Sequence, residues 1–492
     1  MPQVACAGVS DSSSAGAARS VRLAGFAAAA VLLVFLAAFG VRASASLSRP
    51  FTSIPGERAS PVDSYNDAVF SLGGRALLNR GLVAAKLGGE FGAGDRYADH
   101  PPFAYVAVAA TQAIVGDRPA AAPILAFTAS VAAALLLYAL LRELGIGAVT
   151  AAVAVAVGLS IPMFLDYGTM LDTLMLGLPF AVAYLLVWQR SMDGRSGTAA
   201  LAATAAAVAL VAWEGVLLVA LAMAVTAAVR RRAGLRIVLA SGGGLGAALI
   251  AIALWVSWVG GIGVLLDKGL YRGGHSSDVS LGRYAGDQFE HARQYLGVAG
   301  LVVLLVGACA LLIAPRFRPI GAIALATPVV YALAFREGAD LHDYWNYWLL
   351  VPMVLGVGAL TTIAGRAAKP LVVAAAVAGA TGVVIAGYAL SSPIAQARGL
   401  ADRTVDSLAP TREPVAGQRW VPVLPTSADD GVGDTGLWLM PAARYNLGVP
   451  LRFTGGPEIV AYARRHPRHW LVVGYSLVRG RDAAIALGEP EP

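Results

Sequence analysis

A series of apolar runs without any charged residue extends along most of this chain. A helix needs about 20 mainly apolar residues to cross a bilayer. Hydrophobic residues make up 57% and charged residues 14% of the sequence, against roughly 45–50% and 25% in soluble domains. The candidate spans are residues 23–41, 103–116, 121–141, 148–165, 173–189, 198–212, 215–229, 237–258, 297–314, 320–335, 345–364 and 370–390. We therefore predict an all-α polytopic membrane protein with about 11–13 transmembrane helices.

The residues before the first run have a different composition. Residues 1–18 are rich in Ser, Ala and Gly, and we predict a disordered cytoplasmic N-terminus there. The run 23–41 follows Arg19 and Arg22. Because it is longer than the apolar core of about 7–15 residues in a signal peptide, we favour an uncleaved first span over a cleaved signal peptide.

Positive charge falls in every second gap between the runs. The net charge of +7 is divided into short clusters, which indicates membrane topology and not a nucleic-acid partner. The clusters are Arg142, Arg190 with Arg195, Arg230 to Arg232, Arg316 with Arg318, and Arg366 with Lys369. The positive-inside rule makes these gaps cytoplasmic and the others external, including everything after about residue 391. Twelve spans would put both termini on one side, whereas this pattern needs an odd number, so we expect one misassigned run, first of all 103–116, or one hidden hairpin.

Cysteine and lysine are both scarce. Cys6 and Cys309 are the only cysteines, so the sequence offers no disulfide framework and no cysteine metal site. Three lysines stand against 34 arginines, a bias typical of GC-rich genomes. We predict a multi-pass protein of a bacterial cytoplasmic membrane.

Two external loops and a terminal segment complete the predicted organisation. A transmembrane catalytic domain covers residues 19–390, with a first external loop at 42–102, in which a short surface helix is predicted from Tyr65 to Leu82, and a second at 259–296. Residues 391–492 contain a helical pattern, "PEIVAYARRHP", followed by "HWLVVGY", which is typical of a buried strand. We expect a small extracytoplasmic α/β domain in this segment.

Ionisable side chains gather in the gaps predicted to be external. Any one of them could be a solvated helix end, and Asp172 before Thr173 could simply cap a helix. Four separate gaps nevertheless deliver carboxylates or histidines to one membrane face, which favours a shared acidic cavity. These residues are Asp63, Asp67, Asp95, Asp99, His100, Asp166, Asp172, Glu214, Glu337, Asp340, His342 and Asp343.

Four stretches carry a resemblance to a known family. The stretches "VDSYNDAVFSLGGRALLNRG", "DHPPFAYVAVAA", "GTMLDTLMLGLPFAVAYLLVW" and "LHDYWNYWLLVPMVLGVGAL" occur in this order, and the resemblance extends from about residue 20 to about 365. The chain resembles the GT-C glycosyltransferases, in particular the branch with the protein O-mannosyltransferases and the lipid A aminoarabinose transferase. The matching positions are Asp63, His100 before Pro101 and Pro102, Asp172, and His342 with Tyr344. Two departures are Ser64 where the family often has Glu, and His100 where it often has Lys.

The resemblance implies a sugar donor linked to polyprenyl phosphate and a reaction at the outer membrane face. Attack by an acceptor hydroxyl on the anomeric carbon needs a base, which a carboxylate supplies; we expect Asp63, with Asp67 as its competitor and Asp172 as a third catalytic candidate. Cations stabilise the leaving phosphate, and Arg336 is favoured among Arg272, Arg283, Arg293, Arg336, His100 and His342. A divalent metal is an alternative aid, with Asp63, Asp172 and His342 as its ligands.

The aromatic residues of "HDYWNYW" leave two explanations open. Tyr344, Trp345, Tyr347 and Trp348 fit an interfacial belt, and such rings can also stack on a sugar. The predicted substrate-binding set is His100, Glu214, Arg336, His342, Asp343, Tyr344 and Trp345.

We therefore predict an inverting glycosyltransferase, with an Asp base, that transfers a hexose or pentose such as mannose. Its partners would be a polyprenyl-phosphate-linked sugar donor, an extracytoplasmic glycan, lipid or protein acceptor, and membrane lipids. The main alternative is a transporter or flippase of lipid-linked sugars, which typically carries ionisable residues within spans and internal repeats. A third is an inactive relative that acts as a scaffold.

Overall fold

The computed structural model describes most of the membrane region and parts of the C-terminal segment. The described residues are 11–47, 65–92, 95–96, 98, 100–272, 280–341, 343–364, 418, 421–424, 451–453, 456–473 and 476–479. The candidate span 370–390 lies outside this set.

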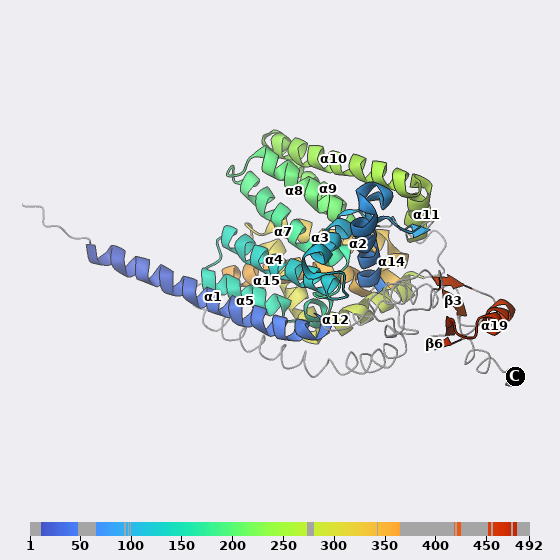
Figure 1. Ribbon diagram of the computed structural model, residues 1–492. Coiled ribbons are helices and arrows are strands. Elements are labelled where there is room, and N and C mark those ends of the chain that lie inside the picture. The colour runs from blue at the N-terminus through green and yellow to red at the C-terminus, as the bar shows by residue number, and fades with distance from the viewer. Residues whose placement is uncertain are drawn as a thin grey trace, which may run out of the picture.

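A bundle of helices forms the main body (Figure 1). Six segments of the described chain are apolar and long enough to cross a membrane, and the stretch 213–259 among them contains two helices, α9 and α10. Four shorter apolar helices, α3, α5, α8 and α13, complete the bundle. The helices are α1 (Asp11–Leu47), α2 (Tyr65–Ala84), α3 (Phe103–Val115), α4 (Ala121–Glu143), α5 (Ala148–Leu159), α6 (Pro162–Tyr167), α7 (Thr173–Met192), α8 (Thr198–Val211), α9 (Trp213–Arg230), α10 (Leu235–Val259), α11 (Ile262–Arg272), α12 (Leu281–Ile313), α13 (Arg318–Ala334), α14 (Arg336–Leu341) and α15 (Leu350–Ile363), with 3-10 turns η1 (Lys86–Gly88), η2 (Arg231–Gly234) and η3 (Asp343–Leu349).

Helix α1 packs through one narrow stripe. Ala28, Leu32, Phe35, Phe39 and Ala43 are its buried apolar residues, and their spacing of three or four places them on one face. The other end of α1 projects beyond the bundle (Figure 1). Residues 11–18, which composition predicted to be disordered, are already helical.

Two predicted segments differ from their structures. The run 148–165 is broken after Leu159, so that α6 starts anew at Pro162. The predicted loop 259–296 is largely helical, because α11 follows α10 closely and α12 begins at Leu281. Gly297 interrupts α12 with a φ of 70°, a conformation that glycine adopts without a steric penalty.

The surface helix predicted in the first loop is present as α2. Its Ala68, Leu72, Ala76 and Leu77 are buried, and the helix packs against α3. The run 103–116, suspected of misassignment as a span, is the helix α3, whose 13 residues are fewer than the about 20 that a span needs.

Small residues allow close packing between α8 and α10. A Cβ added to Gly244 would press against the backbone carbonyl of Ala202, well inside van der Waals contact, whereas one added to Gly246 on the same helix meets nothing within 4 Å. Such small residues let the backbones of membrane helices approach closely.

We expect Gly244→Ala to lower the free energy of unfolding by about 1–3 kcal/mol, because the helices must separate to admit the methyl group. Gly246→Ala is the matched control and should be neutral or stabilising by up to about 1 kcal/mol, since alanine has the higher helix propensity. Thermal unfolding of both variants in detergent measures the difference. Equal melting temperatures for the two variants would contradict the close contact.

The charged ends of several helices meet at one end of the bundle. Glu143 at the end of α4 pairs with Arg190 and Arg195, and its backbone oxygen accepts a hydrogen bond from Arg316. Arg230 donates to the backbone oxygen of Met192. The arginine-bearing gaps that the structure describes thus lie together at this end.

The C-terminal part contains a small mixed sheet. Its order is β4 (Leu451–Phe453), β3 (Val421–Leu424), β5 (Trp470–Val473), β6 (Ser476–Arg479), with β3 parallel to both neighbours and β5 antiparallel to β6. Helix α19 (Gly456–Arg465) buries Ile459 and Ala463 together with Leu471 of β5. The expected helix and strand of the α/β segment are both present. In the first loop, β1 (Glu90–Gly92) and β2 (Asp95–Arg96) pair antiparallel.

Candidate functional site

Asp172 lies at the centre of a polar cluster at the N-terminus of α7. Its Oδ1 accepts hydrogen bonds from the backbone N–H of Leu174 at 3.0 Å and from Thr173 Oγ1 at 3.3 Å, so the residue is the N-cap that the sequence allowed. The residue is fully buried. A buried carboxylate that only caps a helix needs no more than one oxygen for that purpose, and here the second oxygen has another partner.

That partner is Asn66, in the first turn of α2. Its Nδ2 donates to Asp172 Oδ2 at 2.8 Å and to Tyr344 Oη at 3.1 Å. The three residues come from the first loop, the start of α7 and the η3 turn. Sequence reasoning missed Asn66, although it lies between the two carboxylates singled out in "PVDSYNDAVF".

Asp67 joins the same cluster through the backbone. Its Oδ1 accepts a hydrogen bond from the N–H of Leu171 at 2.6 Å. The first turn of α2 therefore forms hydrogen bonds both with the residue before Asp172 and with the Asp172 carboxylate itself. The structure thus brings Asp67 of the first loop to the segment that precedes α7.

His100 reaches the cluster through Thr173. Its Nδ1 lies 3.2 Å from Thr173 Oγ1, and its ring lies 5.8 Å from that of Phe70. Thr173 Oγ1 also lies 3.3 Å from Asp172 Oδ1, so this hydroxyl links the His100 ring to the Asp172 carboxylate.

The aromatic residues after position 342 are packed inside the protein, so the belt interpretation is wrong. Tyr344, Trp345, Tyr347 and Trp348 are all at most 5% exposed. Trp348 donates from Nε1 to the backbone oxygen of Leu174 at 2.9 Å. A belt residue would instead present its ring to the lipid headgroups.

Tyr344 and Trp345 differ in their position relative to the polar cluster. Tyr344 lies with its ring 5.8 Å from that of Tyr167, and Tyr167 in turn lies 5.2 Å from Tyr295. Trp345 packs away from the cluster, against Tyr331 and Phe335 of α13. The structure thus places Tyr344 in the site and Trp345 in its wall.

Glu214 belongs to the first turn of α9 and not to a loop. Only Ala212 separates α8 from α9, and Glu214 is 3% exposed. A Cβ on Gly177 of α7 would touch both Ala212 and Trp348. The start of α9 therefore packs beside the wall that Trp348 forms, a little more than one turn beyond Asp172.

The described residues predicted to contact a phosphate fall into those already in ion pairs and those that are not. Arg283 and Arg293 form exposed ion pairs with Asp287 and Glu290 of their own helix. Arg336 begins α14 and is half-buried, and within the described chain it has no ion pair. The side chain of Arg272 lies outside the described residues. Among the predicted phosphate contacts, Arg336 and His100 are described and lie close in sequence to the clustered segments.

Two cations at the end of α2 form ion pairs with a nearby carboxylate. Lys86 and Arg80 both pair with Glu90, at 3.1 and 3.2 Å. Their hydrogen bonds hold the pKa of the Glu90 carboxyl below its usual range. These two side chains stabilise the turn after α2.

Asp166 serves the fold of this region. It forms an ion pair with Arg42 of α1, whose Nε lies 3.1 Å from Asp166 Oδ1. The Asp166 side chain is 1% exposed and that of Arg42 12%. This pair ties the end of α1 to α6, immediately before the segment that carries Leu171 and Asp172.

Several predicted residues cannot be placed. Asp63, Asp99 and His342 lie outside the described residues, as do the side chains of Asp95, Asp340 and Asp343. Two of the three predicted metal ligands, Asp63 and His342, are in that set. Among the described residues, no group of three or more His, Cys, Asp or Glu could hold a metal ion.

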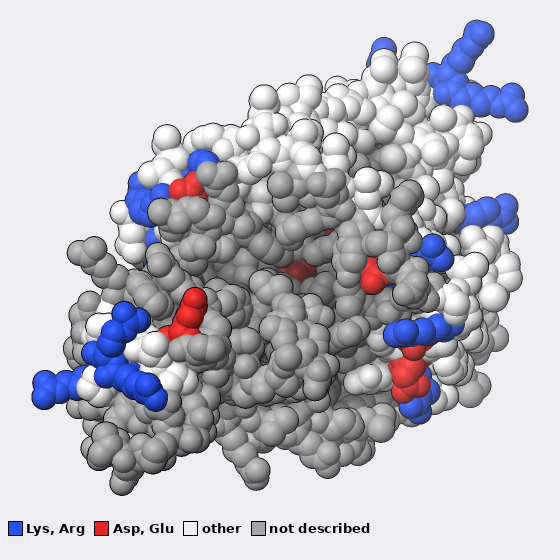
Figure 2. Space-filling view, turned by 90° about the vertical axis from the view of Figure 1, so that its right-hand side faces the viewer, with Lys and Arg blue, Asp and Glu red and all other residues white. Residues whose placement is uncertain are grey.

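The end of the bundle that carries the cluster is shown in Figure 2. Acidic atoms are visible near the middle of this face, and most of the described lysine and arginine side chains lie toward its edges. Helices α2, α11 and α14 and the C-terminal sheet lie on this side of the molecule (Figure 1).

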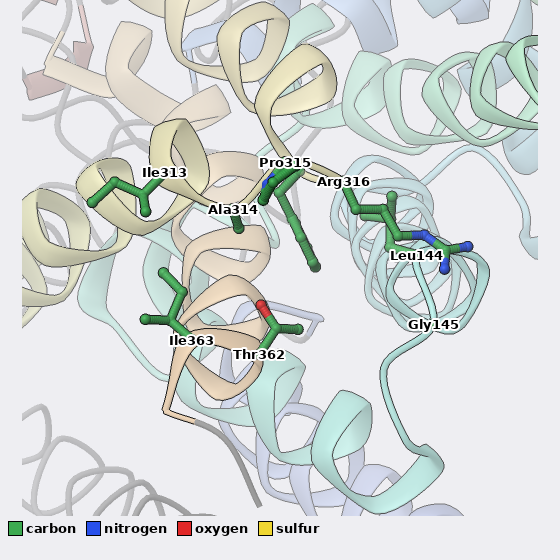
Figure 3. Close-up of a pocket in the computed structure, with 9 residues that line it drawn as sticks. Leu144, Gly145, Ile313, Ala314, Pro315, Arg316, Thr362 and Ile363 are labelled. Atoms are coloured by element: carbon green, nitrogen blue, oxygen red, sulfur yellow. The ribbon is translucent and has the colours of Figure 1, made fainter.

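A cavity of about 500 Å³ lies at the arginine-bearing end and contains none of the predicted site residues. It is lined by Leu144, Gly145, Ile313, Ala314, Pro315, Arg316, Phe317, Thr362 and Ile363. Figure 3 shows the Arg316 guanidinium directed past Leu144 and Gly145, away from Ile313 and Ile363. This apolar cavity is therefore separate from the candidate site.

The fold is similar to that of two solved structures. The crystal structure of ArnT from Cupriavidus metallidurans in the apo state matches with a TM-score of 0.57 and 14% sequence identity, over 91% of this chain and 90% of that one. The structure of ArnT from the same organism bound to undecaprenyl phosphate matches with a TM-score of 0.55 and 15% identity, over 90% and 89% of the two chains. No family model and no curated protein sequence matches this chain. The fold expected from the resemblance is thus confirmed: the chain has the fold of these ArnT structures.

Proposed function

We propose, from the ArnT fold of this chain, that it is a membrane glycosyltransferase of the GT-C type that uses a sugar linked to polyprenyl phosphate. The observation that carries the proposal is the convergence of Asn66, Asp67, His100, Asp172 and Tyr344 from four distant segments. The neighbour bound to undecaprenyl phosphate supports a polyprenyl-phosphate lipid as the partner. The site would face the outside of the membrane, because the arginine-rich gaps gather at the opposite end.

The reaction is a direct displacement with inversion. An acceptor hydroxyl oxygen attacks the anomeric carbon, the bond from that carbon to the phosphate oxygen breaks, and the polyprenyl phosphate leaves with the electron pair. The hydroxyl proton passes to a carboxylate, for which we propose Asp63, with Asp67 as the alternative. Cations near the departing phosphate oppose its growing negative charge.

The contacts of the described side chains indicate which residue could take the proton and which could contact the phosphate. Asp67 already accepts from the Leu171 N–H, and Asp172 is buried with both oxygens hydrogen-bonded. A base must reach its substrate, so we assign Asp172 to organising the site and the proton transfer to Asp63. Arg336 and protonated His100 are the proposed phosphate contacts.

A divalent metal would act as a further aid at the phosphate. Its proposed ligands are Asp63, Asp172 and His342, which supply the oxygen and nitrogen atoms that such ions accept. Asp172 contributes one oxygen to Asn66 and the other to the cap of α7, so its fit to this role depends on an exchange of partners.

Binding and turnover in detergent test the proposal. Purified protein should bind undecaprenyl phosphate in native mass spectrometry, and it should release or transfer sugar from a member of a panel of polyprenyl-phosphate hexoses and pentoses. A transporter or flippase would bind such lipids without consuming them, since vectorial transport has no meaning in detergent. Absence of both binding and turnover would overturn the proposal.

The identity of the base gives a sharper prediction. We expect Asp63→Asn to reduce kcat by about 100-fold or more, as for loss of a general base, while undecaprenyl phosphate still binds. Asp67→Asn should reduce it less, because an asparagine oxygen can still accept from Leu171 N–H. Steady-state turnover of both variants, with Asn79→Ala on the exposed face of α2 as control, measures the order. The reverse order would make Asp67 the base, and full activity of both would favour a different mechanism.

A further inference from the structure

Beyond the residues that would carry the chemistry, we propose that Asn66 is a positioning residue: its amide group holds the Asp172 carboxylate and the Tyr344 hydroxyl in a fixed relation to each other. The inference rests on the function proposed above, because it concerns the same site. Its evidence is a pair of hydrogen bonds from a single nitrogen atom.

These two hydrogen bonds use both N–H hydrogens of the Asn66 side chain. A side-chain NH2 group has two hydrogens, and Nδ2 directs them to Asp172 Oδ2 and Tyr344 Oη. Asn66 lies in the first turn of α2, the helix that packs against α3. The residue therefore joins three elements through one rigid, planar group.

Asp172 is held on both sides by this arrangement. Leu174 N–H and Thr173 Oγ1 bind Oδ1, and Asn66 binds Oδ2, which fixes the plane of the carboxylate. Loss of the Asn66 donor would leave the buried Oδ2 without this hydrogen bond and allow the carboxylate to rotate. The cap on α7 would survive such a rotation, but the direction of Oδ2 would not.

The same hydrogen bond orients the Tyr344 hydroxyl group. Its oxygen accepts from Asn66, so its own O–H proton is directed away from Asn66. The ring of Tyr344 packs on Tyr167, which limits where that proton can go. Asn66 thus presents Tyr344 as a hydrogen-bond donor on the far side of its hydroxyl.

A double-mutant cycle tests this role. Asn66→Ala and Tyr344→Phe should each lower kcat by about tenfold, with the KM for the donor changed by less than about threefold. Because both changes break the same link, the double variant should be no more than about threefold worse than the poorer single variant. The probe is the polyprenyl-phosphate sugar that the wild-type protein consumes, and Asn79→Ala is the control on the exposed face of α2.

A second variant separates positioning from folding. Asn66→Asp has the same shape and no N–H donor, and it should lose kcat at least as strongly as Asn66→Ala while undecaprenyl phosphate still binds. Independent, multiplying losses of kcat in the cycle, or full activity of Asn66→Ala, would overturn the inference.

A failure of the proposed function is recognised separately. If the wild-type protein neither binds undecaprenyl phosphate nor consumes any donor, the function fails, and the same cycle is read from melting temperatures. Melting shifts that are smaller in combination than their sum would support the Asn66 link, and additive shifts would overturn it.

Discussion

Asp172→Asn should lower turnover by about 100-fold while leaving α7 capped, because preorganised polar groups contribute this much in buried sites. Asparagine caps a helix as well as aspartate does, so the bond from Leu174 N–H can persist. The second atom of the side chain then becomes an NH2 group and faces the NH2 group of Asn66, 2.8 Å away in the native arrangement. Two donors cannot bond to each other, so the link from α2 to α7 is lost together with the negative charge.

The measurement is kcat for the consumed donor, together with thermal unfolding in detergent. Asp193→Asn is the matched control, because Asp193 flanks the opposite end of the same helix at its C-cap. We expect the control to keep its activity. A loss of less than about threefold for Asp172→Asn would show that the carboxylate has only its structural role.

Asp166→Ala should give the largest loss of stability among the ionisable residues of this region, about 3 kcal/mol. Removal of one partner from a buried ion pair costs about 3–5 kcal/mol because the other charge stays in a poorly solvated place. Arg42 is 12% exposed, which favours the lower end of this range. Since α6 precedes the segment of Leu171 and Asp172, the substrate site should loosen as well.

Thermal unfolding of the variant measures this effect. Asp287→Ala removes the exposed pair with Arg283, where the two side chains are 42% and 61% exposed, and should cost no more than about 0.5 kcal/mol. The double variant Arg42→Met with Asp166→Leu should recover most of the loss, because it leaves no buried charge. Equal melting temperatures for Asp166→Ala and Asp287→Ala would contradict a buried pair.

The apolar runs and the arginine clusters were reliable guides because they are local properties. A stretch such as 121–141 must become a helix in lipid to satisfy its backbone, and it is the core of α4. The contacts of Arg190, Arg195 and Arg316 with Glu143 confirm that alternate gaps share one end of the bundle. Short elements were harder, because the break after Leu159 and the helical start of α12 depend on neighbouring helices.

The candidate site was foreseen in part. Asp67, His100, Asp172 and Tyr344 were chosen from three gaps, and the structure brings them together. Aromatic residues at a span boundary have the composition of a membrane belt, so nothing in "YWNYW" distinguishes rings that face lipid from rings that face protein.

The sequence by itself determined that this chain crosses a membrane many times and which ends of its helices carry the arginines, since hydropathy and charge act over neighbouring residues. Only the tertiary structure decided that Asn66 meets Asp172 and Tyr344, which are 106 and 278 positions away. Contacts over such separations depend on which helix faces pack together. The shapes of many side chains together determine which helix faces pack, so no short stretch of sequence predicts these contacts.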